Sequence, residues 1–129
     1  LRNGEDLTIV AIGAMVRPAL RSVDFQRKKG VSIELIDPRT LVPLDKEMIF
    51  KSVRKTGRLI IVDEARDTCS AASHIAALCA EECFAALKAP IKRVTVNDVA
   101  IPYSPPLEKN VLPNEERINN AVSEVLDFA

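Results

Sequence analysis

The sequence predicts an α/β domain in which helices cover both faces of a mostly parallel sheet, so that the fold has three layers. Short apolar runs alternate along the chain with segments of helical spacing, in the order β-α-β-α-β-α-β-α. The runs at 7–12 and 59–62 are apolar nearly throughout, which is typical of strands that are covered on both sides. We therefore expect a single domain over residues 1–129 with right-handed crossovers.

A strand at 7–12 opens the predicted fold, and Gly13-Ala14 turns from it into a helix. Pro18 lies in the first turn of that helix, where its missing N–H costs no hydrogen bond. A cationic last turn and Gly30 favour the end of the helix. The apolar residues keep the spacing of one buried face: Val16, Ala19, Leu20 and Val23.

The second strand, 31–36, ends at Asp37-Pro38, because proline offers no N–H to a sheet. An apolar loop follows and is held rigid by Pro43. Asp45 is a candidate N-cap for a helix over 46–55. We expect this helix to turn three residues inward: Met48, Ile49 and Val53.

A third strand at 59–62 is followed by a charged connection at 63–68. The next helix spans about 70–87, with Ser70 or Ser73 as its cap. It is rich in alanine and cysteine and apolar over most of its circumference, so we expect it to be largely buried.

The last part of the chain holds a fourth strand at 92–96 and a proline-rich loop at 97–113. That loop is long for a compact domain, which favours an interaction surface. Asn114 caps the final helix, with acidic residues in its first turn. The helix has the clearest buried stripe in the sequence: Ile118, Ala121, Val122, Val125 and Leu126.

Charge and cysteine content limit the classes of function. The chain has 18 basic and 18 acidic residues and a formal net charge of +0, which argues against a nucleic-acid or membrane surface. No apolar run reaches the length of a membrane span. Three cysteines form no disulfide framework, which favours a reducing compartment. The sequence has no initiator methionine and starts almost directly at a strand, so we expect it to be part of a longer polypeptide.

Ligands of open parallel sheets bind beyond the carboxyl ends of the strands. The first such turn here contains one glycine, so it is neither a dinucleotide-binding fingerprint nor a phosphate loop. An anion could still rest on the amide groups at the start of the following helix. We therefore take Gly13, Ala14 and Arg39 as candidate anion contacts.

His74 is the single histidine of the chain, which disfavours a hydrolytic triad and suggests a capping or surface residue. Cys79 and Cys83 share a helix face, and we interpret them as core residues rather than as metal ligands. Cys69 differs because it precedes a helix start, where a thiolate is favoured.

Two alternative functions follow from the residues alone. One is a free-standing α/β ligand-binding or signalling module, although a phospho-acceptor receiver needs an acidic pair where this chain has Gly13-Ala14. The other is a thiol enzyme that uses Cys69.

Asp63 and Glu64 could form a paired-carboxylate site. Neighbouring strand residues point to opposite faces, so we expect a solvated pair instead.

Four segments, in order, resemble one known family. They read DLTIVAIGAMV at 6–16, IDPRTLVPLD at 36–45, SVRKTGR at 52–58 with IVDEA at 61–65, and PYSPPLE at 102–108. They are similar to the carboxyl-terminal domain of the β subunit of thiamine-diphosphate-dependent 2-oxo acid dehydrogenases. Pyruvate, branched-chain 2-oxo acid and acetoin dehydrogenases belong to this group within the transketolase superfamily.

The resemblance implies a heterotetramer of two α and two β subunits that decarboxylates its substrate and passes the acyl unit to the lipoyl group of the acyltransferase component (E2). Thiamine diphosphate and Mg²⁺ would lie between the α subunit and an amino-terminal β domain that is absent here. This chain would then be non-catalytic and bind no cofactor. Its partners would be the α subunit, a second β subunit and E2, in the bacterial cytoplasm or the mitochondrial matrix.

The resemblance also implies a sheet of about five strands, because the superfamily adds a strand, typically antiparallel at one edge. Part of 99–111 could pair in that way. Two departures from the family affect interfaces. The segment 68–74 lacks the family's glycine-rich turn, and Lys88 replaces an acidic residue near the E2 docking patch. We expect the interface residues to be Ile101, Pro102, Tyr103, Glu81, Glu82 and Asp127.

Overall fold

The computed structural model describes residues 1–97 and 112–128. Four strands form one sheet in the order β2-β1-β3-β4, and every strand pair in it is parallel. The elements are β1 (Leu7–Ala11), η1 (Gly13–Met15), α1 (Val16–Lys28), β2 (Ile33–Ile36), α2 (Lys46–Thr56), β3 (Leu59–Arg66), α3 (Ala71–Cys83), η2 (Phe84–Ala86), β4 (Lys92–Val96) and α5 (Glu115–Leu126).

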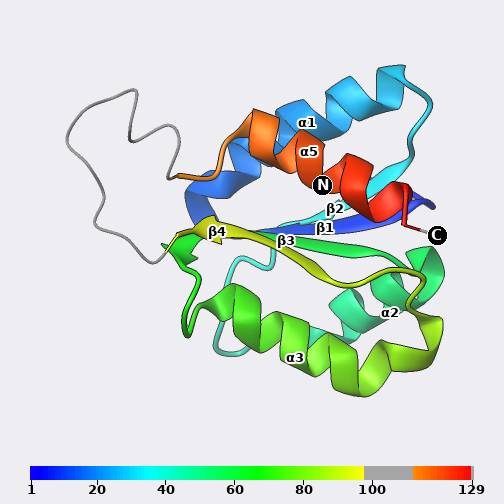
Figure 1. Cartoon of the computed structure of the whole chain (residues 1–129). Coiled ribbons are helices and arrows are strands. Elements are labelled where there is room, and N and C mark those ends of the chain that lie inside the picture. The colour runs from blue at the N-terminus through cyan, green and yellow to red at the C-terminus, as the bar shows by residue number, and fades with distance from the viewer. Residues whose placement is uncertain (98–111, 129) are drawn as a thin grey trace.

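Helices cover both faces of this sheet. Helices α1 and α5 lie side by side on one face, and α2 and α3 lie on the other (Figure 1). Each face has its own apolar cluster, built from alternate residues of the strands: Ile9 and Ile60 face α1 and α5, whereas Val10 and Ile61 face α2 and α3. The predicted three-layer α/β architecture is therefore confirmed.

The described residues form four strands rather than about five. The predicted extra strand in 99–111 lies outside them. An antiparallel contact does occur at the β2 edge, where Arg2 forms an isolated bridge with Leu35. The Leu35 amide donates to the Arg2 carbonyl at 3.0 Å, and the Arg2 amide donates to the Leu35 carbonyl at 3.4 Å.

The predicted helix starts are confirmed by side-chain caps. Asp45 accepts a hydrogen bond from the Met48 amide, Ser70 accepts one from the Ser73 amide, and Asn114 accepts one from the Arg117 amide. Each cap satisfies an amide that has no partner within its own helix. Of the two caps considered for α3, the structure uses Ser70.

Helix α2 corrects one expected core residue. Met48 is 53% exposed, whereas Ile49, Phe50 and Val53 are buried. The buried face of α2 therefore includes Phe50 in place of Met48, one helical position away from the predicted face.

Helix α3 is shorter and more exposed than predicted. It ends at Cys83, and η2 continues it for one tight turn. Only one stripe of α3 is buried, made of Ala72, Ile75, Cys79 and Cys83. The other faces of α3 carry alanines, whose small side chains lose little free energy when they are exposed to water. The apolar composition of the helix therefore overstated how much of it is buried.

Strand β3 is longer than predicted. It continues through Asp63 to Arg66, a segment expected to be a connection, and Arg66 pairs with Val96 after a register shift. This extension carries charged residues past the apolar core to the carboxyl-terminal edge of the sheet.

Candidate functional site

The carboxyl-terminal edge of the sheet holds the predicted anion contacts. Gly13 and Ala14 are exposed and belong to the short η1 rather than to the start of α1. Arg39 is held by its own turn: its amide donates to Asp37 Oδ1 at 3.0 Å, and its Nε lies 3.4 Å from Asp37 Oδ2. The Arg39 guanidinium group is therefore already paired with a carboxylate of its own turn. The shared anion contact of these residues remains a prediction.

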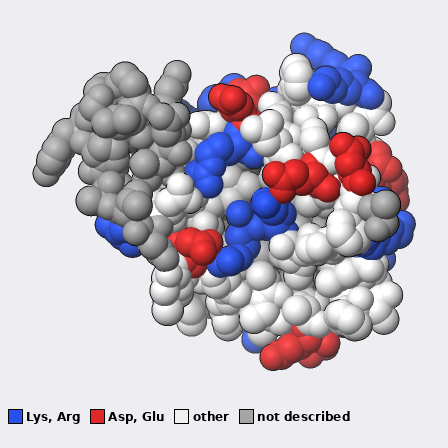
Figure 2. Space-filling view, viewed as in Figure 1, with Lys and Arg blue, Asp and Glu red and all other residues white. Residues whose placement is uncertain are grey.

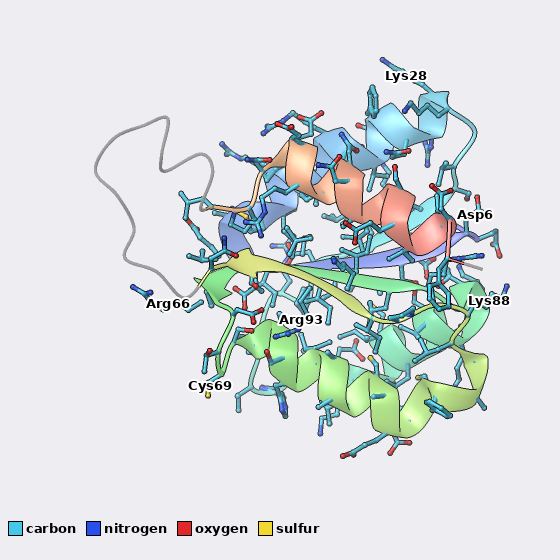
Figure 3. All side chains as sticks on the ribbon, in the orientation of Figure 1. Asp6, Lys28, Arg66, Cys69, Lys88 and Arg93 are labelled. Carbon is cyan, nitrogen blue, oxygen red and sulfur yellow. The ribbon has the colours of Figure 1, made fainter. Side chains whose placement is uncertain are left out.

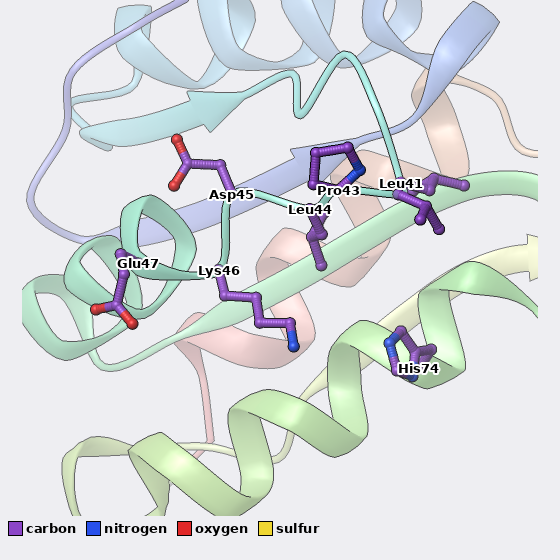
Figure 4. Close-up of a pocket in the computed structure, with 8 residues that line it drawn as sticks. Leu41, Pro43, Leu44, Asp45, Lys46, Glu47 and His74 are labelled. Atoms are coloured by element: carbon purple, nitrogen blue, oxygen red, sulfur yellow. The ribbon is translucent and has the colours of Figure 1, made fainter.

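An open pocket of about 590 Å³ lies between the proline loop and α3 (Figure 4). Its lining consists of 41–47 and His74, and we name it the proline-loop pocket. Val42 is 94% exposed, and the Asp45 carboxylate is used by the α2 cap. His74 is an exposed residue near the start of α3, as predicted. The pocket therefore combines the apolar loop residues 41–44 with the charged start of α2, and the His74 imidazole lies on the opposite wall.

Asp63 is buried, which corrects the expectation of a solvated carboxylate pair. Its Oδ2 accepts from the Ala72 amide at 3.3 Å, and its Oδ1 accepts from the Ala65 amide at 3.2 Å. Glu64 points to the other side of the strand and is exposed. The Asp63 carboxylate therefore acts as a second cap for α3, supplied from β3.

The segment between β3 and α3 is fixed by Asp67. Thr95 donates to Asp67 Oδ1 at 2.8 Å, and Arg93 Nη1 lies 3.1 Å from the same oxygen. The backbone carbonyl of Asp67 accepts from the Ser73 hydroxyl. Sequence reasoning missed Asp67, because its partners come from β4, more than twenty residues away. Cys69 lies exposed near this network with a φ of 61° (Figure 3).

The other two cysteines are core residues, as predicted. Burial, with a smaller contribution from Cys83, raises the pKa of Cys79 to about 12. Burial also raises the pKa of Cys83, whose thiol lies 3.9 Å from the Phe50 carbonyl. Both thiols therefore stay protonated at neutral pH and are not nucleophiles.

A second surface lies at the amino-terminal edge of the sheet, near the end of α5. It is a shallow groove of about 480 Å³. Phe84 is 77% exposed and Phe128 is 53% exposed, which is unusual for rings of this size. We name it the Phe84–Phe128 groove; its lining is Phe84, Ala85, Leu87, Lys88, Ala89, Pro90 and Phe128.

The floor of this groove is held by hydrogen bonds to neighbouring elements. The Lys88 amide donates to the Gly57 carbonyl at 2.7 Å, and the Leu87 amide donates to the Phe84 carbonyl at 3.2 Å. Ala89 is buried against the core. The groove is therefore ordered before any partner binds, which lowers the entropy cost of binding.

The predicted interface residues divide into two sets. Glu81 and Glu82 are exposed in the last turn of α3, and Asp127 is the exposed C-cap of α5. All three belong to elements whose ends meet at the Phe84–Phe128 groove. The others, Ile101, Pro102 and Tyr103, lie outside the described residues.

Charges elsewhere on the described surface are mixed. Figure 2 shows basic and acidic side chains interspersed over β4 and α5. Lys92 pairs with Glu124 at 2.7 Å, and burial lowers the pKa of Arg117 in the same shallow depression. This pairing leaves no large basic field on that face, in agreement with the balanced composition.

The family described as "Transketolase, C-terminal domain" matches residues 1–118. The chain belongs to this family. The acetoin:2,6-dichlorophenolindophenol oxidoreductase subunit beta of Bacillus subtilis is 45% identical over 97% of the chain and 36% of that protein. The 2-oxoisovalerate dehydrogenase subunit beta and the pyruvate dehydrogenase E1 component subunit beta of the same bacterium are 38% and 39% identical, over 98% of the chain and 39% of each protein.

The transketolase C-terminal chain thus spans less than two fifths of these curated relatives and matches their carboxyl-terminal part. A solved structure titled "Split gene transketolase, inactive beta4 tetramer" superposes with a TM-score of 0.85 at 29% identity, covering 97% of the chain and 40% of that protein. A 2-oxoglutarate:ferredoxin oxidoreductase from Magnetococcus marinus superposes with a TM-score of 0.67 at 12% identity, over 98% of the chain and 19% of that protein, and shows the shared fold. None of the described helices is long and apolar enough to cross a membrane.

Proposed function

We propose that this chain is the carboxyl-terminal domain of the β subunit of a thiamine-diphosphate-dependent dehydrogenase that acts on a 2-oxo acid or on acetoin. The observation that carries the proposal is 38% to 45% identity to β subunits named for acetoin, 2-oxoisovalerate and pyruvate. The complete enzyme oxidatively decarboxylates a 2-oxo acid, or cleaves acetoin, and transfers the acyl unit to lipoyl-E2. It works in the bacterial cytoplasm or, in a eukaryote, in the mitochondrial matrix.

The contribution of this domain is assembly. The proline-loop pocket (Figure 4) and the Phe84–Phe128 groove expose apolar side chains at opposite ends of the strands, so two partners can bind at the same time. Subunit contacts with the α chain and with a second β chain use the carboxyl-terminal edge. E2 uses the groove; Glu81 and Glu82 lie in the last turn of α3, just before Phe84, and Asp127 directly precedes Phe128.

Thiamine diphosphate and Mg²⁺ belong to the complete enzyme. Within residues 1–97 and 112–128, no three His, Cys, Asp or Glu side chains gather as metal ligands. Asp63, an acidic residue at the expected edge of the sheet, already accepts two backbone hydrogen bonds. The described residues do not fit the cofactor, and we derive no catalytic step from them.

Activity of the complete enzyme tests the parent assignment. The full β subunit is co-expressed with its α subunit, supplied with thiamine diphosphate and Mg²⁺, and assayed for reduction of 2,6-dichlorophenolindophenol with acetoin, pyruvate or 2-oxoisovalerate. We expect reduction with one of the three substrates. Failure of the two subunits to assemble, or an assembled enzyme inactive with all three, contradicts the proposal.

Calorimetry separates the role of this domain from that of the whole enzyme. Titration of residues 1–129 with thiamine diphosphate and Mg²⁺ is expected to give no binding heat, whereas the assembled enzyme gives a saturating signal. Tight binding to the isolated chain would place the cofactor site within it and contradict the assembly role.

A further inference from the structure

The segment 2–6 lies along the outer side of β2 and is fastened to it on both sides of Asn3-Gly4. Before this pair, Arg2 exchanges two backbone hydrogen bonds with Leu35. After it, the Asp6 amide donates to the Ser32 carbonyl at 2.8 Å. The peptide between Asn3 and Gly4 is therefore held between two anchored points.

Gly4 is buried where this segment crosses the backbone of β2. A Cβ added to it would lie 2.2 Å from the Ile33 carbonyl carbon and 2.4 Å from the Glu34 nitrogen, which is too close for any side chain. The crossing therefore requires glycine at this position. The Gly4 amide also donates a hydrogen bond to the Glu34 carboxylate, so its nitrogen is fixed as well.

Asn3 precedes this glycine and is exposed to water. Asn3-Gly4 is the one Asn-Gly pair in the sequence. Such a pair is chemically labile, because glycine has no side chain to hinder the attack of its nitrogen on the asparagine amide. In the folded chain the attack is suppressed: the Gly4 N–H is bound by a carboxylate, beside which a deprotonated nitrogen would be repelled.

We propose that Asn3 is a site of spontaneous deamidation, that the pairing of segment 2–6 with β2 controls its rate, and that the isoaspartate product releases the segment. When the segment opens, the Gly4 nitrogen loses its proton to water, attacks the side-chain carbonyl carbon of Asn3 and displaces ammonia. Water then opens the resulting cyclic succinimide at either carbonyl, which yields aspartate or isoaspartate. The reaction needs water alone and involves no oxidation or reduction.

The isoaspartate product changes the length of the main chain. Its backbone runs through the former side-chain carbons, so one extra carbon atom separates the anchor at Arg2 from Gly4. The hydrogen bonds of Arg2 and of Asp6 then no longer align with their partners on β2 at the same time. Because the product does not revert to asparagine, the release is permanent.

The rate of amide loss in the full β subunit tests this inference, measured by mass spectrometry of the peptide that contains Asn3. The native protein is expected to react at least about tenfold more slowly than the protein unfolded in urea, because reaction requires the segment to open. Asn120 is the internal reference; it is exposed in α5, and we expect it to keep its amide because Ala121 follows it. Equal rates in the native and unfolded protein, or no loss at Asn3 in either, overturn the proposal.

Glu34→Ala removes the acceptor of the Gly4 N–H. We expect it to speed the native reaction by about tenfold and to leave the rate in urea unchanged, since hydrogen bonds to charged groups are among the stronger ones. Glu5→Ala is the matched control, because it removes an exposed carboxylate two positions from Asn3, and it should react at the wild-type rate. A Glu34→Ala rate equal to that of the wild type, or an equal acceleration by Glu5→Ala, shows that Glu34 does not control the reaction.

Hydrogen exchange of the Gly4 amide measures the same opening without any substitution, and so remains decisive if Glu34→Ala fails to fold. We expect this amide to be protected in the unmodified β subunit and to lose its protection once Asn3 has become isoaspartate. An amide that exchanges freely from the start contradicts control by pairing. An amide that stays protected after conversion contradicts release of the segment.

Discussion

Gly57 illustrates how one residue can connect the fold to the Phe84–Phe128 groove. It holds a φ of 73° as the C-cap of α2, and its surroundings are crowded by the Ala86 carbonyl and the Lys88 stem. Gly30 has a similar φ of 87°, but no atom lies within 4 Å of the position a Cβ would take. Comparison of substitutions at the two glycines therefore separates the cost of a left-handed backbone, which both share, from the cost of close packing, which applies to Gly57 alone.

Gly57→Ala is expected to lower the free energy of unfolding more than Gly30→Ala does. The Gly30 substitution carries the cost of a left-handed alanine, about 1 kcal/mol. The Gly57 substitution adds displacement of the Ala86 carbonyl, for a total of about 2–3 kcal/mol. Urea denaturation of both variants measures the difference, and equal losses would show that the contact with Lys88 and Ala86 is soft.

Asp63 and Glu64 are adjacent carboxylates with opposite environments. Asp63 is buried and accepts from two backbone amides, whereas Glu64 is exposed. Asp63→Ala is expected to destabilise the fold by about 1–3 kcal/mol, because it leaves the Ala72 amide at the start of α3 unpaired. Glu64→Ala is the matched control and should change the midpoint of denaturation by less than the error. Similar midpoints for both variants would contradict the capping role.

At the scale of elements, β2 and α2 are joined by charge at the edge of the sheet. Lys55 Nζ lies 2.6 Å from Glu34 Oε1. Burial opposes ionisation of Glu34, but the hydrogen bonds from Lys55 and Ser52 prevail and lower its pKa. The hydrogen bond that the Lys55 ammonium donates to Glu34 raises the pKa of Lys55 in turn. The pair therefore stabilises the fold when both groups are charged.

The pKa of Glu34 is lower in the folded chain than in the unfolded chain. The ionised carboxylate therefore stabilises the fold fully at pH values above its unfolded pKa, and this stability is lost as the pH falls through its folded pKa. Glu34→Gln is accordingly expected to cost about 0.5–1 kcal/mol at pH 7 and to cost nothing at acid pH, where wild-type Glu34 is itself protonated. Glu5 lies 4.0 Å from the same ammonium and is far more exposed, so Glu5→Gln is the control. A Glu34→Gln penalty that persists in acid would show a packing effect instead.

Much of this element pattern can be predicted from the sequence, because caps and apolar periods are local. Asp45, Ser70 and Asn114 each begin a helix as expected. Met48 and the end of α3 could not be predicted, since the face that a helix buries depends on the sheet beneath it. The charged end of β3 was missed for the same reason: its partner, Val96, is remote in sequence.

At the scale of the whole molecule, the three thiols report on cooperativity. Cys69 is exposed, whereas Cys79 and Cys83 are buried in the cluster between the sheet and the α2/α3 layer. We expect one thiol to react rapidly with a thiol-specific reagent in the native protein and the other two to react at the rate of unfolding. Mass spectrometry of the modified peptides identifies them. Rapid reaction of Cys79 would mean that α3 opens separately from the sheet.

The candidate site shows where sequence reasoning reaches its limit. Glu81, Glu82 and Asp127 were chosen by resemblance; they lie on elements whose ends meet at the groove, and their part in an interface stays a prediction. Phe84 and Phe128 were not chosen, because a ring just outside a buried helical stripe has no distinguishing local pattern. They are brought together only at the amino-terminal edge of the sheet, where the turn after α3 and the residues after α5 line one groove.

The two hydrogen bonds between Arg2 and Leu35 have a further consequence for solubility. They occupy the amide and carbonyl of Leu35 on the outer side of β2, the open border of the sheet. Removal of residues 1–3 would leave the amide and carbonyl of Leu35 without these partners, so that a strand of another molecule could pair with β2 and start aggregation. The segment before β1 therefore shields this border of the sheet, and a chain that lacks residues 1–3 should become turbid on warming before a chain that keeps them.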